Sequence, residues 1–355
     1  MATFHSLKVV RHGPEAEDAV RIGLAVPAEL REQLSFQPGQ HVAVRATVGG
    51  EELRRTYSIV SEPGSAILEI APRILPDGRM SQHLARDARV GATLDILAPS
   101  GGFHVGTDPG TRRTCVAFAA GCGITPVYAI LAHVLAREPD SRCVLVYGNR
   151  TGTRTMLLED LMALKNRYMG RLSLNFIMSA EPQDVALWNG RLDAAKVREL
   201  AGKIFQPGTA GVFLICAPAV DEIRDTLLSL GVDAKRVHAE HFHAARTPAP
   251  VQQQVAAAEK AQTATITLVM DGRRRQFSMP MARETILDAA NAAGFDLPFS
   301  CRAGVCSTCR TRVTRGKVEM SEQYALEDWE LEAGYVLACS SRPVTSDVEL
   351  DYDDK

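Results

Sequence analysis

Three of the chain's eight cysteines lie within nine residues, in the stretch CRAGVCSTC at positions 301–309. Cys301, Cys306 and Cys309 have the spacing C-x4-C-x2-C, and twenty-nine residues separate Cys309 from Cys339. Four thiolates with this spacing can surround the two irons of a 2Fe–2S cluster, if the loop wraps closely enough for backbone N–H groups to reach the sulfurs. The residues between the cysteines are mostly small, which allows that approach. The four cysteines are therefore predicted to hold a 2Fe–2S cluster.

A structural zinc site is the alternative use of clustered cysteines. Zinc sites usually pair two C-x2-C units, whereas this chain has only one. The iron–sulfur interpretation is therefore favoured. The remaining four cysteines are dispersed in or beside apolar segments, where a small buried hydrophobic side chain is the ordinary role. They are Cys115, Cys122, Cys143 and Cys216.

Two upstream segments combine arginine, hydroxyl and glycine residues in an order that suits a flavin nucleotide. In Arg55-Thr56-Tyr57-Ser58, the guanidinium can bind a pyrophosphate, the ring can face an isoalloxazine, and the serine hydroxyl can lie near a flavin nitrogen. Gly78-Arg79-Met80-Ser81 begins a short predicted helix, whose N-terminal N–H groups can bind the same phosphates. Each motif is weak alone, because Tyr57 is equally consistent with a barrel core residue and Ser81 with a helix N-cap.

The segment Gly121-Cys122-Gly123-Ile124-Thr125-Pro126 follows a continuous apolar run and precedes a helical stripe. It departs from the dinucleotide fingerprint G-x-G-x-x-G in its last position, where Pro126 is expected as the first helical residue. Residues 115–135 carry no formal charge and are long enough to cross a bilayer. The two glycines and the proline interrupt that stretch, so strand, glycine loop and helix are the better interpretation.

The elements around these motifs predict three units. Residues 1–108 contain short strands separated by turns and are predicted to form an antiparallel β-barrel. Residues 109–243 alternate apolar strands with helical stretches, which is typical of a parallel, doubly wound α/β sheet. Residues 244–263 are rich in Ala, Gln and Pro and are predicted to be a linker. Residues 264–355 begin with a hairpin at Asp271-Gly272, continue with a helix from Thr285 to Ala293, and contain the cysteine loop.

Composition and charge narrow the possible partners. The formal net charge of −2 argues against nucleic acid and against an anionic membrane surface. The N-terminal residues show no signal peptide, and clustered cysteines without an export signal favour a reducing compartment. The cytoplasm is the expected location.

Barrel, glycine loop, parallel sheet and cysteine loop occur in the order found in one known family. The chain resembles the ferredoxin–NADP reductase superfamily with a C-terminal plant-type 2Fe–2S ferredoxin domain, which has the β-grasp fold. The resemblance runs from TFHSL at the start, through PGQH, GEELRRTYSI, AGCGITP and YGNRT, to GYVLACSSRPVTSDVELDYD at the close.

This resemblance implies a role for each motif. It places FAD on Arg55, Thr56, Tyr57, Ser58, Gly78, Arg79, Met80 and Ser81. It places the nicotinamide nucleotide on Gly121, Gly123 and Thr125. Ser58, Cys216 and Glu240 are implied near the reacting atoms, and Phe242 beside the flavin ring. The family pattern at Cys216 is Cys-Gly-Pro, whereas this chain has Cys-Ala-Pro, and Cys122 stands where a serine is usual.

Electron counting orders the cofactors. A nicotinamide gives two electrons as hydride and a 2Fe–2S cluster accepts one, so the FAD must lie between them. The chain has no paired Glu-x-x-His motifs for oxygen activation, so a separate oxygenase is expected to receive the electrons. The motifs do not tell which oxygenase is served: Rieske ring-hydroxylating and steroid hydroxylase systems need the same reductase. A redox-sensing iron–sulfur module is a further alternative, against which the intact flavin and nicotinamide motifs count.

Two further expectations concern specificity. NADPH is predicted over NADH, because the second strand of the α/β unit ends in Arg150 and carries no carboxylate before Glu159. The oxygenase is expected to dock on the ferredoxin domain. Residues 264–355 hold 15 acidic and 11 basic residues, against 27 and 29 in residues 1–263, and the acidic residues concentrate between Glu319 and Glu332.

Overall fold

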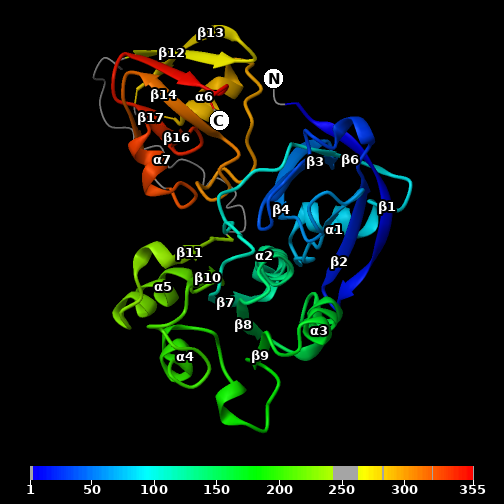
Figure 1. Ribbon diagram of the computed structural model, residues 1–355. Helices are drawn as coiled ribbons and strands as arrows, with labels where there is room; N and C mark the ends of the chain where they lie inside the picture. The colour runs from blue at the N-terminus through cyan, green and yellow to red at the C-terminus, as the bar shows by residue number, and fades with distance from the viewer. Residues whose placement is uncertain (1–2, 243–262, 282–283, 322, 355) are drawn as a thin grey trace.

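The structure is a computed structural model, which describes residues 3–242, 263–281, 284–321 and 323–354. Three units follow one another along the chain, and Figure 1 shows them as a barrel, a parallel sheet with helices, and a C-terminal α+β unit. The predicted linker at residues 244–263 lies outside the described residues except for Thr263. The predicted fold class is confirmed.

The barrel unit is a six-stranded antiparallel sheet in the order β4-β3-β6-β1-β2-β5. A bridge between Ile59 and Ile70 joins the two edges, so that no long edge is left open. Alternate residues of the strands fill one apolar core, which also contains Leu84 of helix α1. The elements are β1 (His5–Ala16), β2 (Ala19–Ala25), β3 (His41–Val48), β4 (Glu51–Ser58), β5 (Ile67–Ile70), β6 (Thr93–Ile96) and α1 (Arg79–Arg86).

The middle unit is a five-stranded sheet in the order β11-β10-β7-β8-β9, with every neighbouring pair parallel. Its central strands are buried on both faces, which explains their continuous apolar sequences. The strands are β7 (Thr114–Ala120), β8 (Arg142–Asn149), β9 (Leu172–Met178), β10 (Val212–Cys216) and β11 (Val237–Ala239). The helices are α2 (Ile124–Arg137), α3 (Leu158–Arg167), α4 (Ala194–Leu200) and α5 (Val220–Ser229).

In these units one local prediction is wrong, and the alternative role of Ser81 as a helix N-cap is excluded. Helix α2 begins at Ile124, directly after a 3-10 turn at Gly121–Gly123, so Pro126 lies inside the first turn rather than at its first position. Proline is tolerated there because the first-turn N–H groups have no partner within the helix. The N-cap of α1 is Gly78 and not Ser81, whose side chain closes the preceding turn.

The C-terminal unit is a five-stranded mixed sheet in the order β13-β12-β18-β14-β16. The predicted hairpin is present, and Asp271 and Gly272 both have positive φ, as its tight turn requires. Thr285 caps α6 by accepting from the N–H of Asp288. The elements are β12 (Thr263–Met270), β13 (Arg273–Pro280), α6 (Ile286–Ala292), β14 (Arg310–Arg315), β15 (Val318–Met320), α7 (Asp328–Glu332), β16 (Tyr335–Leu337), β17 (Ser341–Pro343) and β18 (Asp347–Asp351).

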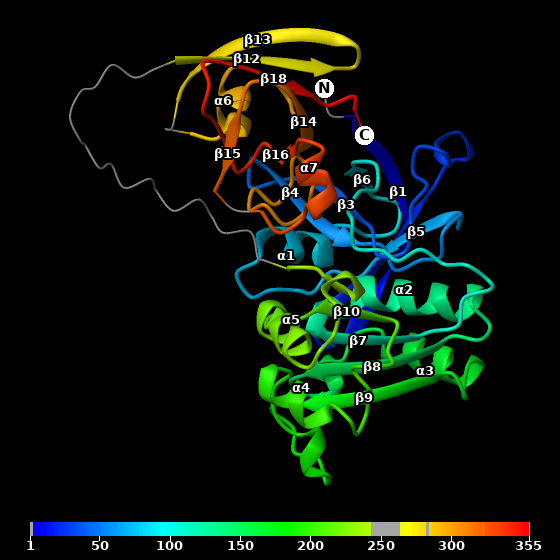
Figure 2. The same cartoon turned by 60° about the vertical axis from the view of Figure 1, so that its left-hand side comes forward.

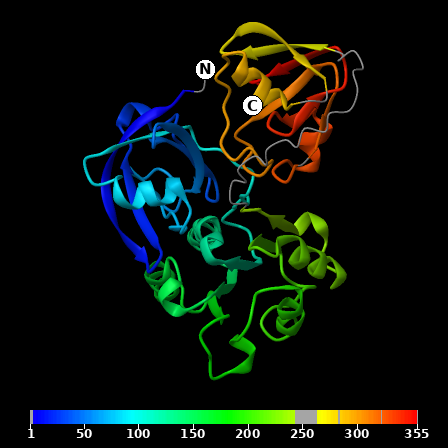
Figure 3. The same cartoon turned by 180° about the vertical axis from the view of Figure 1, so that it is seen from behind.

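The three units meet near the centre of the molecule. The C-terminal unit and the barrel lie side by side, and both face the upper end of the parallel sheet in Figures 2 and 3. A contact between His41 and Cys306 joins the barrel to the cysteine loop. The segment after β11 reaches both units, because Glu240 approaches His41 and the ring of His241 packs against Tyr324. Among the described residues no helix is long and apolar enough to span a membrane.

Candidate functional site

The four predicted cluster cysteines are brought together and are all buried. The Cys301 thiol lies within hydrogen-bonding reach of the Cys306 and Cys339 thiols. Cys309 lies just before β14 and Cys339 just after β16, and a hydrogen bond of 3.2 Å from the Ala338 N–H to the Cys309 carbonyl joins the two segments. Antiparallel pairing of two strands thus brings Cys339 to the loop.

Backbone N–H groups point at the sulfurs, as predicted. The N–H of Ala303 donates to Cys301 Sγ at 3.3 Å, and that of Cys301 lies 3.5 Å from Cys306 Sγ. Gly304 has a φ of 70°, which lets the loop turn back over the thiols. Hydrogen bonds among these thiols lower the pKa of Cys301 and raise the pKa values of Cys306 and Cys339.

The surroundings of the four cysteines fit a 2Fe–2S cluster. Within the described part of the chain, no group of three or more Cys, His, Asp or Glu side chains is placed to hold a single metal ion. A 2Fe–2S cluster needs only two thiolates on each iron. The Ser300 hydroxyl and, near Cys309 and Cys339, the Tyr352 hydroxyl are buried without a partner among the described residues. The sulfides of a cluster would accept hydrogen bonds from such groups.

The predicted flavin motif occupies the end of β4, beside β3. Tyr57 and Ser58 pair with Val42 and His41 of β3. Arg55 is half-buried and forms no ion pair with any residue that the structure describes, so its guanidinium is available to an anion such as a pyrophosphate. Burial raises the pKa of Tyr57 above its usual value, so this phenol stays neutral. These features fit FAD.

The second flavin segment lies at the start of α1, which packs against β3 and β4. A Cβ atom on Gly78 would lie 2.4 Å from Ser81 Oγ, so only glycine fits there. The Ser81 hydroxyl donates to the Gly78 carbonyl and accepts from the Leu75 N–H, so it closes the turn. Arg79 is ion-paired with Glu51 at 2.6 Å, and Met80 is buried in the barrel core. The turn therefore presents backbone N–H groups rather than the serine side chain.

The glycine loop after β7 is held by contacts from distant parts of the chain. Gly121 has a φ of 55°, and its carbonyl accepts from the Tyr147 hydroxyl at 2.9 Å. A Cβ atom on Gly123 would lie 2.0 Å from the Cys216 carbonyl oxygen. Thr125 is buried and donates from Oγ1 to the Cys122 carbonyl. Gly123 therefore permits the end of β10 to approach the loop.

Cys216 and Glu240 lie at the ends of neighbouring strands. The N–H of Glu240 donates to the Ile215 carbonyl at 2.9 Å, which places its side chain beside Cys216. Burial raises the pKa of the Cys216 thiol, so this cysteine is protonated and a poor nucleophile. Burial also raises the pKa of Glu240 to about 8, and its Oε2 has no partner among the described residues. Phe242 is exposed.

A small cavity of about 150 Å³ lies where the three units meet. His41 of β3 contributes to its wall from the barrel, Glu240 from the parallel-sheet unit, and Val305 and Ser307 from the cysteine loop. The His41 Nε2 lies 2.9 Å from the Cys306 carbonyl, and its Nδ1 lies 3.9 Å from Glu240 Oε1. The three units therefore meet at this cavity, and Glu240, a predicted site residue, lines it together with the cysteine loop.

The end of β8 carries an additional charged group. Arg150 is exposed, as expected for a residue that binds a ligand phosphate. Glu181, from the segment after β9, accepts from the N–H of Gly152 at 2.7 Å. A carboxylate is thus close to Arg150 in the chain's fold, although none is close in its sequence. Arg154 is ion-paired with Asp18 of the barrel unit.

Three residues that bear on the site were not predicted. His41 belongs to the PGQH segment, and that segment gave the only available signal. Arg54 precedes the flavin motif but turns toward the C-terminal unit, where it ion-pairs with Asp296 at 2.9 Å. Glu181 follows a different strand from Arg150. Only tertiary contacts reveal the position of each.

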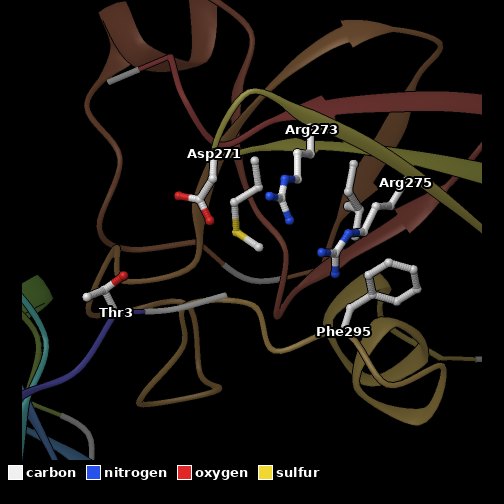
Figure 4. A pocket seen from close by; sticks show the side chains of 7 residues that line it. Thr3, Asp271, Arg273, Arg275 and Phe295 are labelled. Carbon is white, nitrogen blue, oxygen red and sulfur yellow. The ribbon is translucent and has the colours of Figure 1, made fainter.

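A larger cavity of about 340 Å³ lies elsewhere, on the C-terminal unit. In Figure 4, Arg273 and Arg275 of β13 line it together with Asp271, Phe295 and Thr3. None of the predicted site residues lines this cavity.

Three family models match successive parts of the chain. Residues 6–105 match the oxidoreductase FAD-binding domain, residues 118–220 the oxidoreductase NAD-binding domain, and residues 268–344 the 2Fe-2S iron-sulfur cluster binding domain. FAD, a nicotinamide nucleotide and a 2Fe–2S cluster are therefore the cofactors of this fold.

Curated relatives match the chain over nearly its full length. The chain is 41% identical over 359 residues to one of the subunits of the 1,2-phenylacetyl-CoA epoxidase of Escherichia coli, covering 100% of this chain and 99% of that protein. It is 31% identical over 350 residues to the ferredoxin reductase component of the 3-ketosteroid-9-alpha-monooxygenase of Rhodococcus rhodochrous, covering 95% and 94%. The solved structure of phthalate dioxygenase reductase superposes with a TM-score of 0.56 at 22% identity, covering 98% of both chains, and shows the shared fold.

Proposed function

Because the chain belongs to the family of flavin and 2Fe–2S reductases that serve oxygenases, we propose that it delivers electrons from NADPH to an oxygenase of the phenylacetyl-CoA epoxidase type. The 41% identity over the full length supports this partner over the steroid and other oxygenases whose reductases are more distant. The functional units are residues 1–108, 109–243 and 264–355, joined by the linker at 244–263. The cytoplasm is the proposed location.

The meeting of the three units at the cavity of 150 Å³, which Glu240 and the cysteine loop both line, is the observation that carries this proposal. When bound, FAD supplies the exchange between a two-electron hydride donor and a one-electron acceptor. Arg55 and the α1 turn would hold its pyrophosphate, and Tyr57 and Ser58 its ring. Glu240, kept neutral by burial, would present a proton beside the reacting atoms, next to Cys216.

We infer that the nucleotide is NADPH and that Arg150 binds its 2′-phosphate. Arg150 is exposed and unpaired within the described ranges, so no ion pair must break before it binds a phosphate. Glu181 opposes this preference, because a carboxylate repels a 2′-phosphate and accepts hydrogen bonds from a free 2′-hydroxyl. Its hydrogen bond from the Gly152 N–H holds Glu181 at the loop that follows Arg150. The two residues are thus opposing determinants of nucleotide choice.

We place the docking surface for the oxygenase on α7. Trp329 is 56% exposed there, and Glu327 and Glu332 beside it are exposed as well. The Trp329 Nε1 donates to Glu327 Oε2 at 2.7 Å, which fixes the ring against an acidic rim. A large fixed aromatic side chain inside a charged rim is a usual centre of a protein–protein interface. The expected partner surface is basic with an apolar pocket.

Salt and substitution test this docking surface. Trp329→Ala and Glu332→Gln should each raise the apparent KM for the oxygenase, while NADPH–ferricyanide activity stays constant. Coupled turnover should also fall with ionic strength faster than ferricyanide reduction does. Arg275→Gln, in the cavity of Figure 4, is the matched control on the same unit and should leave the KM unchanged. If only the control raised the KM, the surface would lie at β13 instead.

Reconstitution tests the proposed partner. The purified holoprotein is mixed with the oxygenase subunits of a phenylacetyl-CoA epoxidase, and NADPH oxidation is compared with loss of phenylacetyl-CoA. One NADPH oxidised for each thioester consumed would support the proposal. Uncoupled NADPH oxidation with the epoxidase, together with coupled turnover by a steroid or Rieske oxygenase, would overturn it.

A further inference from the structure

The ring of His41 joins the barrel to the cysteine loop. His41 is 4% exposed, and its Nε2 lies 2.9 Å from the carbonyl oxygen of Cys306. Its backbone belongs to the barrel framework, because it pairs with Ser58 of the flavin motif and its N–H donates to the Ser100 carbonyl. One residue therefore contacts both the predicted flavin segment and the backbone of a predicted cluster ligand.

The ring is held in one orientation. A carbonyl only accepts, so the Nε2 must carry the proton that forms this bond. On the other side of the ring, a Cβ atom on Gly101 would lie 3.0 Å from both Cε1 and Nδ1. Gly101 has a φ of 118°, which other residues rarely adopt, so its lack of a side chain leaves room for the imidazole. The backbone of the barrel unit thus holds the His41 ring in position for its contact with Cys306.

Arg54 makes a second contact with the segment that leads into the cysteine loop. It is 7% exposed, and its Nη2 lies 2.9 Å from Asp296 Oδ1. Its guanidinium also lies 4.2 Å from the ring centroid of Phe299. Asp296 and Phe299 shortly precede Cys301, so the barrel holds the chain on both sides of this first cysteine. A buried arginine with both an ion pair and an aromatic partner is a strong, directional contact.

We propose that His41 is a positioning residue for electron transfer within the protein, with Arg54 as the clamp that keeps the C-terminal unit seated on the barrel. This inference rests on the proposed function. Oxidation of one NADPH releases two electrons and one proton. The two electrons would cross the junction one at a time, the first passing on to the oxygenase before the second follows, and the proton would go to solvent. His41 takes up neither; its hydrogen bond fixes the cysteine loop at one distance from the flavin segment.

Loss of the hydrogen bond between His41 and Cys306 should let the cysteine loop move away from the barrel. A buried hydrogen bond of this kind shifts an equilibrium between seated and released forms by roughly tenfold. The rate of cluster reduction should fall by up to the same factor, because electrons cross only in the seated form. Reduction of FAD by NADPH is followed separately, because the His41 Nδ1 also lies 3.9 Å from Glu240 Oε1.

The test compares His41→Phe with His41→Gln in the holoprotein. Phenylalanine keeps an aromatic ring but lacks the Nε2 proton, whereas glutamine restores an N–H donor. Arg45→Gln is the control, because Arg45 lies opposite Arg54 in the sheet but ion-pairs with Asp95 inside the barrel. Hydrogen exchange of residues 296–309 reports seating, stopped-flow absorbance separates FAD from cluster reduction, and visible circular dichroism reports the cluster itself.

In His41→Phe we expect faster exchange in residues 296–309 and cluster reduction up to roughly tenfold slower relative to FAD reduction, with the cluster spectrum unchanged. Glutamine should restore both readings at least in part. Wild-type exchange and wild-type cluster reduction in His41→Phe would overturn the proposal. If that variant fails to incorporate the cluster, Arg54→Gln is judged by the same two readings. No oxygenase is present, so a wrong partner cannot affect the result, and failure of the wild type to reduce its FAD would instead contradict the proposed function.

Discussion

The cysteine loop and the glycine loop after β7 are both short motifs, but different contacts set their geometry. In the cysteine loop the N–H groups that face the sulfurs belong to Cys301 and Ala303, within the loop itself. In the glycine loop the tightest constraint comes from Cys216, whose carbonyl leaves no room for a side chain on Gly123. A motif whose contacts are local can be interpreted from spacing alone. A motif that is held by contacts from distant residues can be located in the sequence, but those contacts cannot be predicted from it.

The largest effect is expected at the predicted cluster site. Cys339→Ser removes one of four thiolates and should abolish the cluster, because serine is a poor ligand for iron in this setting. FAD should remain, since the barrel has an apolar core of its own. The variant should reduce ferricyanide at the wild-type rate and fail to reduce cytochrome c. Visible spectra before and after the substitution check both statements, and loss of FAD together with the cluster would contradict the separation of the units.

The glycine loop should be broken by one methyl group. Gly123→Ala places a Cβ atom 2.0 Å from the Cys216 carbonyl oxygen, so the strand or the loop must shift. Overpacking of this kind costs about 1–3 kcal/mol. Thermal unfolding should show that loss, and NADPH–ferricyanide activity should fall. Gly102→Ala is the matched control, because no atom lies within 4 Å of its added methyl group. Equal stability of the two variants would show that the contact does not restrict the loop.

The preference for NADPH or NADH tests whether Glu181, which follows β9, affects nucleotide binding at the end of β8. Arg150→Ala should lower kcat/KM for NADPH by roughly ten- to a hundredfold, the usual value of a charge-assisted hydrogen bond, with little change for NADH. Glu181→Gln should raise kcat/KM for NADPH relative to NADH, because it removes a repelling charge. Steady-state kinetics of both variants with both nucleotides decide the matter. Equal losses for the two nucleotides in Arg150→Ala would mean that Arg150 does not bind the 2′-phosphate.

The smallest effect concerns the pH dependence of stability. Burial raises the pKa of Glu240 from 4.5 to about 8, and the groups that face it are His41 of β3 and Cys216 of β10. Between these pH values the unfolded chain ionises this carboxyl while the folded chain keeps it neutral. Below pH 4.5 the carboxyl is neutral in both states, so the burial of Glu240 does not lower the free energy of unfolding. As the pH rises from 4.5 to 8, the free energy of unfolding decreases by at most about 1.4 kcal/mol per pH unit.

Glu240→Gln keeps the shape of the side chain without the titration. The melting temperature of the wild type should therefore fall relative to that of the variant as the pH rises from 5 toward 8. A constant difference between the two proteins across this range would show that Glu240 is ionised in the folded state.

Helices, strands and turns could be predicted where the sequence has a regular apolar pattern or a recognisable turn or cap residue, whereas contacts between the units could not. The apolar runs gave the parallel strands, Asp271 and Gly272 gave the hairpin turn, and Thr285 gave the cap of α6. Whether Ser81 caps α1 was left open, because a serine at a turn has the same sequence signal whether it caps a helix or closes the turn, as it does here. The Arg54–Asp296 ion pair joins residues 242 positions apart, and no local pattern predicts such a pair.

The central claim is that electrons reach the cluster only through FAD, across the junction of the three units. Deflavination tests it most directly. The protein is stripped of FAD with its cluster intact, NADPH is added without oxygen, and cluster reduction is followed by electron paramagnetic resonance before and after FAD is restored. We predict no cluster signal until FAD is returned and its full appearance afterwards. Cluster reduction in the absence of FAD would contradict this account.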